Sequence, residues 1–384
     1  MRIMMISNLY GALSRGGAER VVQQETDALV ALGHEVGVVS GEPKGCALPR
    51  LHNELRVYVK NIAFYGDLGR HNAIFRLVWH VIDIWSARST RIFAEIFSRE
   101  KPDVVHTHNV MGLGFGIFAA VRRAGMRHVH TVHDVQLLDP SGLIRGDQVF
   151  HASWLQRAYI AVMRRKIGSP QVVIFPSAFL RDLHVRYGFF STSRHVVLRN
   201  PAPQPASPRT IVGSPARFLF VGQLEPHKGI ALLLHAWEKK SFFASLEIIG
   251  GGSMEKYVRR RAENLSGVHV RGRLDRSDVD AAYDRADWIV VPSTVIENAP
   301  TVLMEALGRG VPAVASAVGG IPELVHDEQN GFLTIPGDLQ SLVIALEKAA
   351  VCGTYRGMSA RAVAVVTGLD VQRHTEQLRE FYVF

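Results

Sequence analysis

Short apolar runs alternate with longer amphipathic segments along the chain. In the first half, this pattern predicts strands at Ile3–Ser7, Glu35–Val39, Val104–His106, Val129–Val132 and Val172–Phe175. The helical periodicity between these runs predicts helices that include Ala18–Leu32 and Ile74–Phe97. Strand and helix in alternation are typical of a doubly wound parallel sheet.

The second half repeats the pattern. Its strands are expected at Phe218–Val221, Leu246–Ile249, Val268–Val270, Trp288–Val291 and Val311–Ala315. Its helices are expected at Ile230–Lys239, Met254–Asn264, Val279–Arg285, Thr301–Arg309 and Gln340–Ala350. The fold class is therefore α/β, with two facing Rossmann-like domains and a ligand in the cleft between them, beyond the carboxyl ends of the strands.

A proline-rich stretch divides the halves. Asn200–Pro215 contains five prolines among its sixteen residues, which disfavours helix and central strand. We expect an N-terminal domain over residues 1–200, a linker over 201–215 and a C-terminal domain over 216–366. Residues 367–384 hold a last helix, Val371–Phe381, expected to pack back on the first domain.

Charge separates the halves as well. Residues 1–200 hold 25 basic and 15 acidic side chains, whereas residues 201–384 hold 19 and 20. The first half therefore meets something anionic. Two cysteines give neither a disulfide framework nor a zinc site, and they suit a reducing cytosol. No run approaches the 18 apolar residues of a membrane span.

Glycine-rich motifs follow three of the predicted strands. They are Ser14–Arg20 with Gly16 and Gly17, Phe220–Gly229 with Lys228, and Ile249–Ser253 with Gly250. Glycines let a backbone approach a ligand closely, and a following helix N-terminus favours anions. A bare Gly-Gly turn is also common in ordinary loops. The absence of a GxGxxG motif in the first of these counts against a nicotinamide enzyme.

The segment Glu297–Glu305 places two carboxylates eight residues apart across a loop-to-helix junction. Pro300 fits the first helical turn, after which Thr301 and Val302 offer free backbone N–H groups. The helix dipole adds to these amides, so a phosphate could bind there with a carboxylate on either side to accept hydrogen bonds from sugar hydroxyls. The alternative is a capped helix with ordinary surface acids.

Taken in order, these motifs resemble the retaining glycosyltransferases of family 4, which have the two-domain GT-B fold. The resemblance covers nearly the full length. It lies in GGAER, His133–Asp134, VGQLEPHKG, IGGGS, DRADWIVVPS, ENAPTVLMEA and GGIPELV followed by NGFL.

The resemblance implies a donor site for a UDP- or GDP-linked sugar. Glu305 would bind the ribose, and Glu297 the hydroxyls of the transferred sugar. The amides of Thr301 and Val302 would meet the diphosphate together with Lys228. The other donor-binding candidates of the second half are Gln223, Gly250, Arg273, Leu274, Asn298, Ala299 and Pro300.

The first half would contribute the Gly16–Gly17 loop, close to the distal phosphate and acceptor, and His133, against the donor sugar. The catalytic candidates are thus His133, Lys228 and Glu297. The family mechanism implies no metal or other cofactor. Gln223 departs from the family, whose members usually carry an Arg that neutralises the leaving diphosphate. Arg15 is our candidate for the replacement charge.

Three basic segments mix arginines with aromatic residues: Arg70–Arg99, Arg157–Lys166 and Arg181–Arg194. We favour binding to an anionic membrane surface over a solvated face, and no nucleic-acid module is recognised. Asp278–Asp280 is interpreted as a helix cap, with Ser277 as the capping residue, and not as a metal motif. The histidines near 106–133 have no supporting acid cluster, so no metal is expected there.

The expected activity is transfer of a sugar, with retention, to a polyprenyl-diphosphate-linked saccharide or another glycan during surface polysaccharide synthesis. The protein would be cytoplasmic and peripheral on the inner face of the membrane. Two alternatives stay open. One is another GT-B enzyme, such as a phosphorylase or a nucleotide-sugar epimerase, and the other is a non-catalytic binding subunit.

Overall fold

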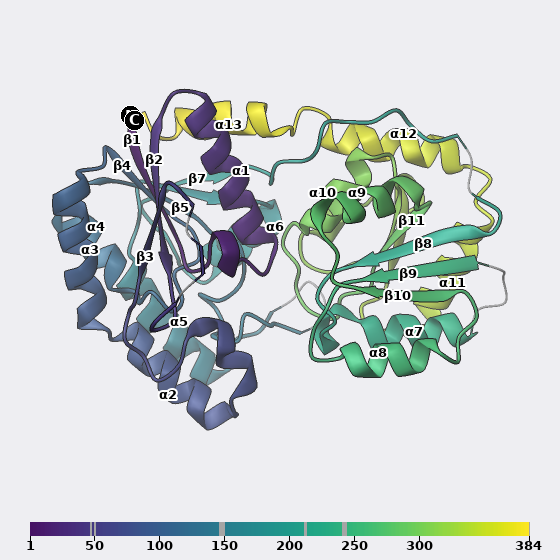
Figure 1. Ribbon diagram of the computed structural model, residues 1–384, viewed down its shortest axis with the longest axis horizontal. Helices are drawn as coiled ribbons and strands as arrows, with labels where there is room; N and C mark the ends of the chain where they lie inside the picture. The colour runs from purple at the N-terminus through teal and green to yellow at the C-terminus, as the bar shows by residue number, and fades with distance from the viewer. Residues whose placement is uncertain (47, 50, 146–149, 211–212, 240–243, 384) are drawn as a thin grey trace. The chain divides into compact units, whose positions relative to one another are not determined.

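The computed structural model describes residues 1–46, 48–49, 51–145, 150–210, 213–239 and 244–383. The chain forms two compact units, each around one parallel sheet (Figure 1). The first comprises Met1–Gly142, Ala152–Arg199 and Val371–Phe384, and the second Leu143–His151 and Asn200–Asp370.

In this division Leu143–His151, within the range predicted for the N-terminal domain, belongs to the second unit. In this segment the Ile144 carbonyl accepts a hydrogen bond of 2.8 Å from the Ile296 amide, which accounts for its position. The residues predicted as the linker, 201–215, and residues 367–370 belong to the second unit as well. Residues 146–149 and, in the predicted linker, residues 211–212 lie outside the described part of the chain.

The first sheet has the strand order β3-β2-β1-β4-β5-β6-β7, and every pairing in it is parallel. Its strands are β1 (Arg2–Ser7), β2 (Glu35–Gly41), β3 (Glu54–Val57), β4 (Val104–Thr107), β5 (Arg127–Thr131), β6 (Val172–Phe175) and β7 (Arg194–Val197). The chain leaves β1 toward β2 on one side and later returns to β4 on the other, so strand order reverses between β1 and β4.

The second sheet has the order β10-β9-β8-β11-β12-β13 and is also parallel throughout. Its strands are β8 (Ala216–Val221), β9 (Ala244–Ile249), β10 (Val268–Gly272), β11 (Trp288–Val291), β12 (Ala313–Ser316) and β13 (Gly331–Thr334). Here the order reverses between β8 and β11, which is the position where sheets of this kind bind ligands. The predicted α/β fold with two parallel sheets is confirmed.

Helices connect the strands of both sheets. Those of the first unit are α1 (Gly17–Ala31), α2 (Ala73–Ile84), α3 (Ala87–Glu100), α4 (Gly116–Arg123), α5 (Trp154–Ile167), α6 (Ala178–Arg186) and α13 (Val371–Glu380). Those of the second are α7 (Ile230–Lys239), α8 (Glu255–Ala262), α9 (Arg276–Arg285), α10 (Thr301–Gly308), α11 (Leu339–Ala350) and α12 (Tyr355–Val366). Short 3-10 turns are η1 (Gly11–Leu13), η2 (Tyr65–Arg70), η3 (Pro226–Lys228) and η4 (Ile321–Glu323).

Two sequence predictions about helices were wrong. The single helix expected over Ile74–Phe97 is divided into α2 and α3, because the Ser86 hydroxyl caps a new helix by accepting a hydrogen bond from the Ser89 amide. The helix α9 begins at Arg276, and Asp275, not Ser277, is its cap. In both cases a short polar side chain satisfies an amide of the first turn.

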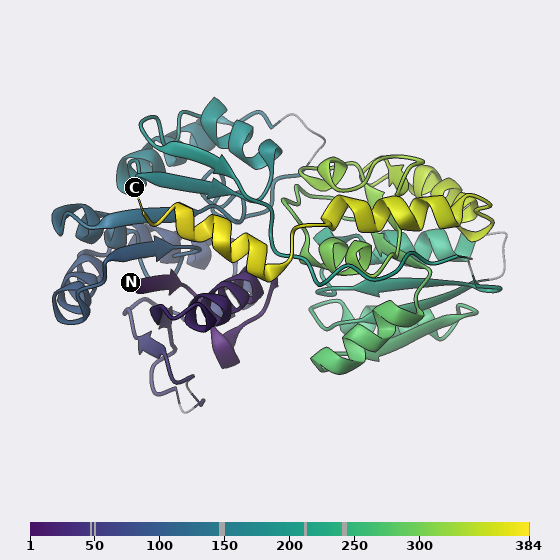
Figure 2. The same ribbon diagram turned by 90° about the horizontal axis from the view of Figure 1, so that it is seen from above.

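The last helix, α13, packs beside α1 within the first unit (Figure 2). His374 of α13 lies with its Nε2 2.9 Å from Oε1 of Glu25 in α1, and both side chains are buried. The Tyr382 hydroxyl, just beyond α13, lies 2.8 Å from Nδ1 of His106 in β4. A buried polar network therefore fastens the C-terminus to the first sheet.

Glu25 also corrects our argument about the histidines. Ligand atoms of Glu25, His106 and His108 lie within 4.8 Å of one another, so an acid does accompany these histidines. Both ring nitrogens of His106 already have partners, the hydroxyls of Tyr382 and Thr131, each at 2.8 Å. Hydrogen bonding thus explains this cluster as a link between α1, β4 and the C-terminus.

Within the described residues, we find no helix that combines the length and the apolar character needed to cross a bilayer.

The buried carboxyl of Asp83 in α2 provides a test of the first unit. It accepts a hydrogen bond of 3.0 Å from the Gly112 amide, and burial raises its pKa from 3.8 to about 7. The neutral carboxyl therefore costs the fold nothing below about pH 4, and stability is lost as pH rises toward 7. We predict that Asp83→Asn, whose amide oxygen keeps the bond to Gly112, gains stability relative to the unchanged protein between pH 4 and 7. Urea unfolding at several pH values would show this, and a pH-independent difference would contradict it.

Candidate active site

The predicted donor-binding residues of the second unit lie in loops after the carboxyl ends of its strands. Because the strands are parallel, these loops share one edge of the sheet. Gln223 and Lys228 follow β8, Gly250 follows β9, and Arg273 and Leu274 follow β10. The segment Glu297–Pro300 follows β11, and α10 then contains Thr301, Val302 and Glu305. One sheet edge thus brings together residues that are up to 82 positions apart, from Gln223 to Glu305.

An ion pair joins two of these loops. The Lys228 ammonium lies 2.6 Å from Oε1 of Glu297, and the Ser293 hydroxyl donates to the same oxygen at 2.8 Å. The side chains are 30% and 13% exposed for Lys228 and Glu297, so both remain open to a ligand at one side. The Thr294 amide donates to the His227 carbonyl at 2.9 Å, which fixes the two loops against each other.

The loop after β12 packs against the backbone of Glu297. The Gly320 amide donates to the Glu297 carbonyl at 2.8 Å. Gly319 has φ +62°, and a Cβ built there would lie 2.0 Å from the Glu297 carbonyl oxygen. The close approach of these two backbones explains the Gly-Gly pair at this position.

The helix α10 begins where the sequence predicts. Pro300 is its N-cap residue, so Thr301 and Val302 are the first two helical residues, whose amides have no partner one turn earlier in the helix. The Asn200 side-chain amide donates to the Ala299 carbonyl at 3.0 Å and holds the preceding loop. The positive end of the helix dipole therefore points toward the loop that carries Glu297.

Glu305 lies on the buried part of α10, and its side chain is 7% exposed. Nη1 of Arg276, in the first turn of α9, donates to Oε1 of Glu305 at 3.0 Å. The same arginine pairs with Asp280 of α9. Asp280 thus belongs to an ion-pair network with Arg276 and Arg309.

Gly250 and Gln223 lie at adjacent strand ends. A Cβ on Gly250 would lie 1.8 Å from the Gly222 carbonyl oxygen, and the Leu224 amide donates to the Gly251 carbonyl at 3.1 Å. The side chain of Arg273 covers the same turn, since a Cβ on Gly251 would meet its Nε at 2.8 Å. A guanidinium therefore borders the turn beside Gln223.

The predicted residues of the first unit lie after β1 and β5. Gly16 caps α1, and its amide donates to Oε2 of Glu19 at 2.8 Å. A phosphate at the Gly16–Gly17 turn would have to displace this carboxylate. The Arg15 guanidinium donates to the Gly66 carbonyl in the same unit.

His133 follows β5 and contacts a second histidine. Its Nε2 lies 2.9 Å from Nδ1 of His108, and burial lowers the pKa of His133 to about 4. The adjacent Asp134 accepts hydrogen bonds from Asn109 and from the Gln136 amide, while burial raises its pKa to about 6. At neutral pH His133 is therefore an uncharged imidazole, in which one ring nitrogen donates a hydrogen bond and the other accepts one.

A pocket of about 210 Å³ lies at the carboxyl end of the first sheet. It is formed where β1, β2 and β3 end and by the loop after β4. Its lining combines apolar side chains, such as Val57, Val59 and Met111, with polar and tyrosine side chains, which are those of Asn8, Glu42, Lys44, Asn61, Tyr58 and Tyr65. Such a mixture is typical of a site that binds a polar organic ligand.

Two family models match this chain. The model of glycosyl transferases group 1 matches residues 207–359, and that of glycosyltransferase family 4 matches residues 15–202. Together the two models, both of glycosyltransferases, match 341 of the 384 residues, and the chain is a glycosyltransferase. The family 4 range falls mostly within the first unit and the group 1 range within the second.

Individual proteins resemble the chain in sequence or in fold. The glycosyltransferase is 26% identical over 356 residues to an uncharacterized 42.6 kDa protein in a cps region of Klebsiella pneumoniae, covering 90% of this chain and 94% of that protein. Sucrose-phosphate synthase from Thermosynechococcus elongatus has a similar fold, with a TM-score of 0.75, 18% identity and coverage of 99% and 98%. HepE of Anabaena in complex with UDP also has a similar fold, with a TM-score of 0.71, 18% identity and coverage of 99% for both chains.

Several residues that position the site of this glycosyltransferase were missed from sequence. Ser293 lies in a motif that we noted, but only the structure shows its bond to Glu297. The motif GGIPELV likewise gave no reason for Gly319 and Gly320. Arg276 has no sequence signal, because its partner Glu305 is 29 residues away.

Gly319→Ala should reduce turnover strongly. A Cβ there collides with the Glu297 carbonyl and would displace the carboxylate, as well as straining a positive φ. Gly337→Ala is the matched control, since Gly337 has φ +77° with nothing within 4 Å of an added Cβ. We expect both variants to lose about 1 kcal/mol of stability from backbone strain, and Gly319→Ala to lose more because of the collision. At a temperature at which both variants are folded, only Gly319→Ala should lose turnover. Equal turnover in the two variants would contradict the role assigned to this contact.

Proposed function

We propose that this glycosyltransferase moves a hexose from a nucleotide-diphosphate sugar to a lipid-linked saccharide or another glycan, with retention at the anomeric carbon. The observation that carries the proposal is the Lys228–Glu297 ion pair, which lies in the loops next to the N-terminus of α10. A cation, a carboxylate and free helix amides are then available to one ligand. These groups match a sugar joined to a diphosphate.

On the donor side, the diphosphate would take Lys228 and the amides of Thr301 and Val302. Glu297 would exchange its bond to Lys228 for hydroxyls of the transferred sugar, while Ser293 keeps its orientation. Glu305, fixed by Arg276, would accept from the ribose hydroxyls. The turn at Arg273 and Leu274 would lie against the base. The solved HepE contains UDP, which supports a uridine donor.

Transfer breaks the bond between the anomeric carbon and the diphosphate oxygen and forms a bond to the acceptor oxygen. In the proposed front-side reaction, the acceptor proton moves to an oxygen of the departing diphosphate, so the protein need not supply a general base. Its contributions are orientation of the sugar and neutralisation of the leaving group. Lys228 and the start of α10 would provide this charge, and we propose that no metal is required.

On the acceptor side, we propose that the pocket beside β1–β3 holds the saccharide. Its tyrosines and asparagines suit sugar rings and hydroxyls. His133, uncharged at neutral pH, would contact the donor sugar. A polyprenyl-diphosphate-linked acceptor for a surface polysaccharide fits the relative from a cps region and the basic first half. The protein would then work on the cytoplasmic face of a membrane.

The charge missing at Gln223 has two candidate sources. Arg273 borders the adjacent turn in the same unit, and Arg15 is the candidate from sequence. Arg273→Gln and Arg15→Gln should be compared for turnover and for affinity toward the nucleoside diphosphate. Substitution of the arginine that replaces the missing charge should lower turnover far more than substitution of the other arginine. Adding Gln223→Arg to that variant should restore part of the lost turnover. Full activity in both variants would show that neither is needed.

Lys228→Gln should lower kcat by about 10²- to 10³-fold, because it removes one preorganised charge from the leaving group. Lys256→Gln in α8, an exposed lysine of the same unit, is the control and should leave kcat unchanged. A loss confined to KM would show that Lys228 only binds the donor.

The proposed activity is tested most simply by a thermal-shift screen across nucleotide sugars, followed by turnover assays with membrane extract. A donor at about 100 times its Kd should stabilise the protein by about 2.7 kcal/mol. Donor binding without transfer to any acceptor would favour the binding subunit, and conversion of donor alone would indicate an epimerase. No response to any nucleotide would refute the proposal.

A further inference from the structure

The helix α2 exposes an apolar face. Its members are Ile74, Leu77, Val78, Val81 and Trp85, which are between 47% and 77% exposed. Starting from Ile74, the positions 77 or 78, 81 and 85 follow at intervals of three or four residues, so these side chains form one stripe along the helix and its C-cap. Two further large apolar side chains, Trp154 and Leu155, are exposed at the start of α5. We call the five residues of α2 the α2 face.

The opposite side of α2 is firmly packed, so its orientation is fixed. Trp79 is fully buried and donates from Nε1 to the Ala63 carbonyl at 2.7 Å. Asp83 accepts from the Gly112 amide, and the Asn61 side chain donates to the Trp79 carbonyl at 3.3 Å. Because these contacts set the rotation of the helix, the α2 face cannot turn inward without breaking them.

Basic residues lie on α2 and on the neighbouring helix α5. The Lys166 ammonium of α5 lies 3.9 Å from the centre of the Trp85 ring, so the ends of α2 and α5 meet. Together the two helices contain the basic residues Arg76, Arg157, Arg164, Arg165 and Lys166. Their single acidic residue, Asp83, is buried. An exposed apolar stripe with tryptophan and a basic border is the composition of a helix that lies in the headgroup region of an anionic bilayer.

Other aromatic residues of the basic segments do not contribute. Trp79, Phe93 and Phe97 are buried in the first unit, as are Phe189 and Phe190. Among the three basic segments, most of the exposed large apolar side chains that could contact a membrane surface therefore lie on α2 and its neighbour α5.

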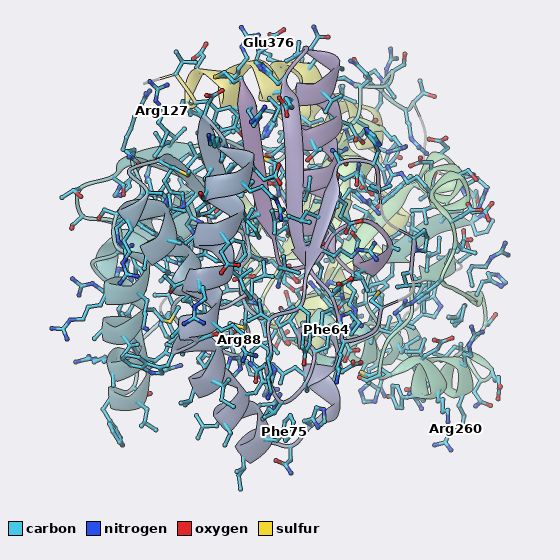
Figure 3. All side chains as sticks on the ribbon, turned by 60° about the vertical axis from the view of Figure 1, so that its left-hand side comes forward. Phe64, Phe75, Arg88, Arg127, Arg260 and Glu376 are labelled. Carbon is cyan, nitrogen blue, oxygen red and sulfur yellow. The ribbon has the colours of Figure 1, made fainter. Side chains whose placement is uncertain are left out.

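We propose that the α2 face docks the first unit on a bilayer that carries anionic phospholipids. The same helix borders the pocket, because Asn61 and Ala63, which bond to Trp79, also line it. Figure 3 labels Phe64 of this lining segment and Phe75 of the first turn of α2. Docking would hold the pocket near the headgroup layer, where a lipid-linked acceptor presents its saccharide. This last step rests on the proposed function, whereas docking itself does not.

Flotation of the full chain with vesicles tests the proposal. The protein should float with vesicles of phosphatidylcholine containing about 30% phosphatidylglycerol, a content at which anionic lipid attracts basic surfaces strongly, and much less with phosphatidylcholine alone. Leu77→Glu/Val81→Glu should reduce binding at least tenfold. The control Ile335→Glu/Val351→Glu changes the net charge equally at exposed apolar positions of the second unit and should bind as the unchanged protein does. Arg76→Gln/Arg165→Gln should weaken binding by about 5-fold per charge removed.

Equal loss in the Leu77/Val81 variant and its control, or no loss in either, would overturn the proposal. Failure of the unchanged protein to float with either vesicle would overturn it as well and would indicate that the α2 face binds a protein partner instead. Turnover on a water-soluble acceptor separates this result from the proposed function. The Leu77/Val81 variant should keep that turnover, and only absence of transfer by the unchanged protein would count against the activity.

Discussion

The ion pair between Lys228 and Glu297 is the contact on which the second unit's site depends. Each residue belongs to a different loop, and each loop follows a different strand of the same sheet. The pair brings the end of β8 to the end of β11, where strand order reverses, and Ser293 and the Gly319–Gly320 loop hold the carboxylate in place. Without a ligand, each charge satisfies the other. A donor supplies both a diphosphate anion and sugar hydroxyls, so it can replace the partner of each charged side chain with an equivalent one. Breaking the ion pair on donor binding therefore costs little free energy.

The first unit buries many polar side chains in its core. Its core contains several histidines whose pKa values burial lowers, among them His106, His108 and His130. They act as neutral hydrogen-bonding groups between strands and helices, and Glu25 with His374 extends this network to the C-terminus. The chain thus returns to its first unit after completing the second, and a buried network holds it there. Most of the positive charge of this unit lies in surface arginines and lysines, such as the arginines of α5, which is a neighbour of the exposed apolar face of α2.

Much of this could be predicted from sequence, because parallel sheets bury short apolar strands that stand out in the pattern. Trp288–Val291 and Val172–Phe175 were predicted to the residue, as was the helix Ile230–Lys239. The strands that were missed, β3, β7 and β13, lie at the edges of the sheets and have mixed composition, such as Glu54–Val57 with its buried Glu54–Arg56 pair. The loops that carry the candidate site were found through their motifs. Their mutual contacts were not, since the bonds of Glu297 to Lys228 and of Glu305 to Arg276 join residues far apart in the chain.

The central claim is that Glu297 holds the transferred sugar while Lys228 holds the diphosphate. Titration calorimetry can separate the two by comparing a nucleoside diphosphate with the corresponding nucleotide sugar, in the unchanged protein and in Glu297→Gln. The account predicts that the variant binds the diphosphate at least as well, because Lys228 is released from its partner, and loses about 10- to 100-fold of the affinity that the sugar adds, the equivalent of a hydrogen bond to a charged group. An equal loss of affinity for both ligands, or none for either, would contradict it.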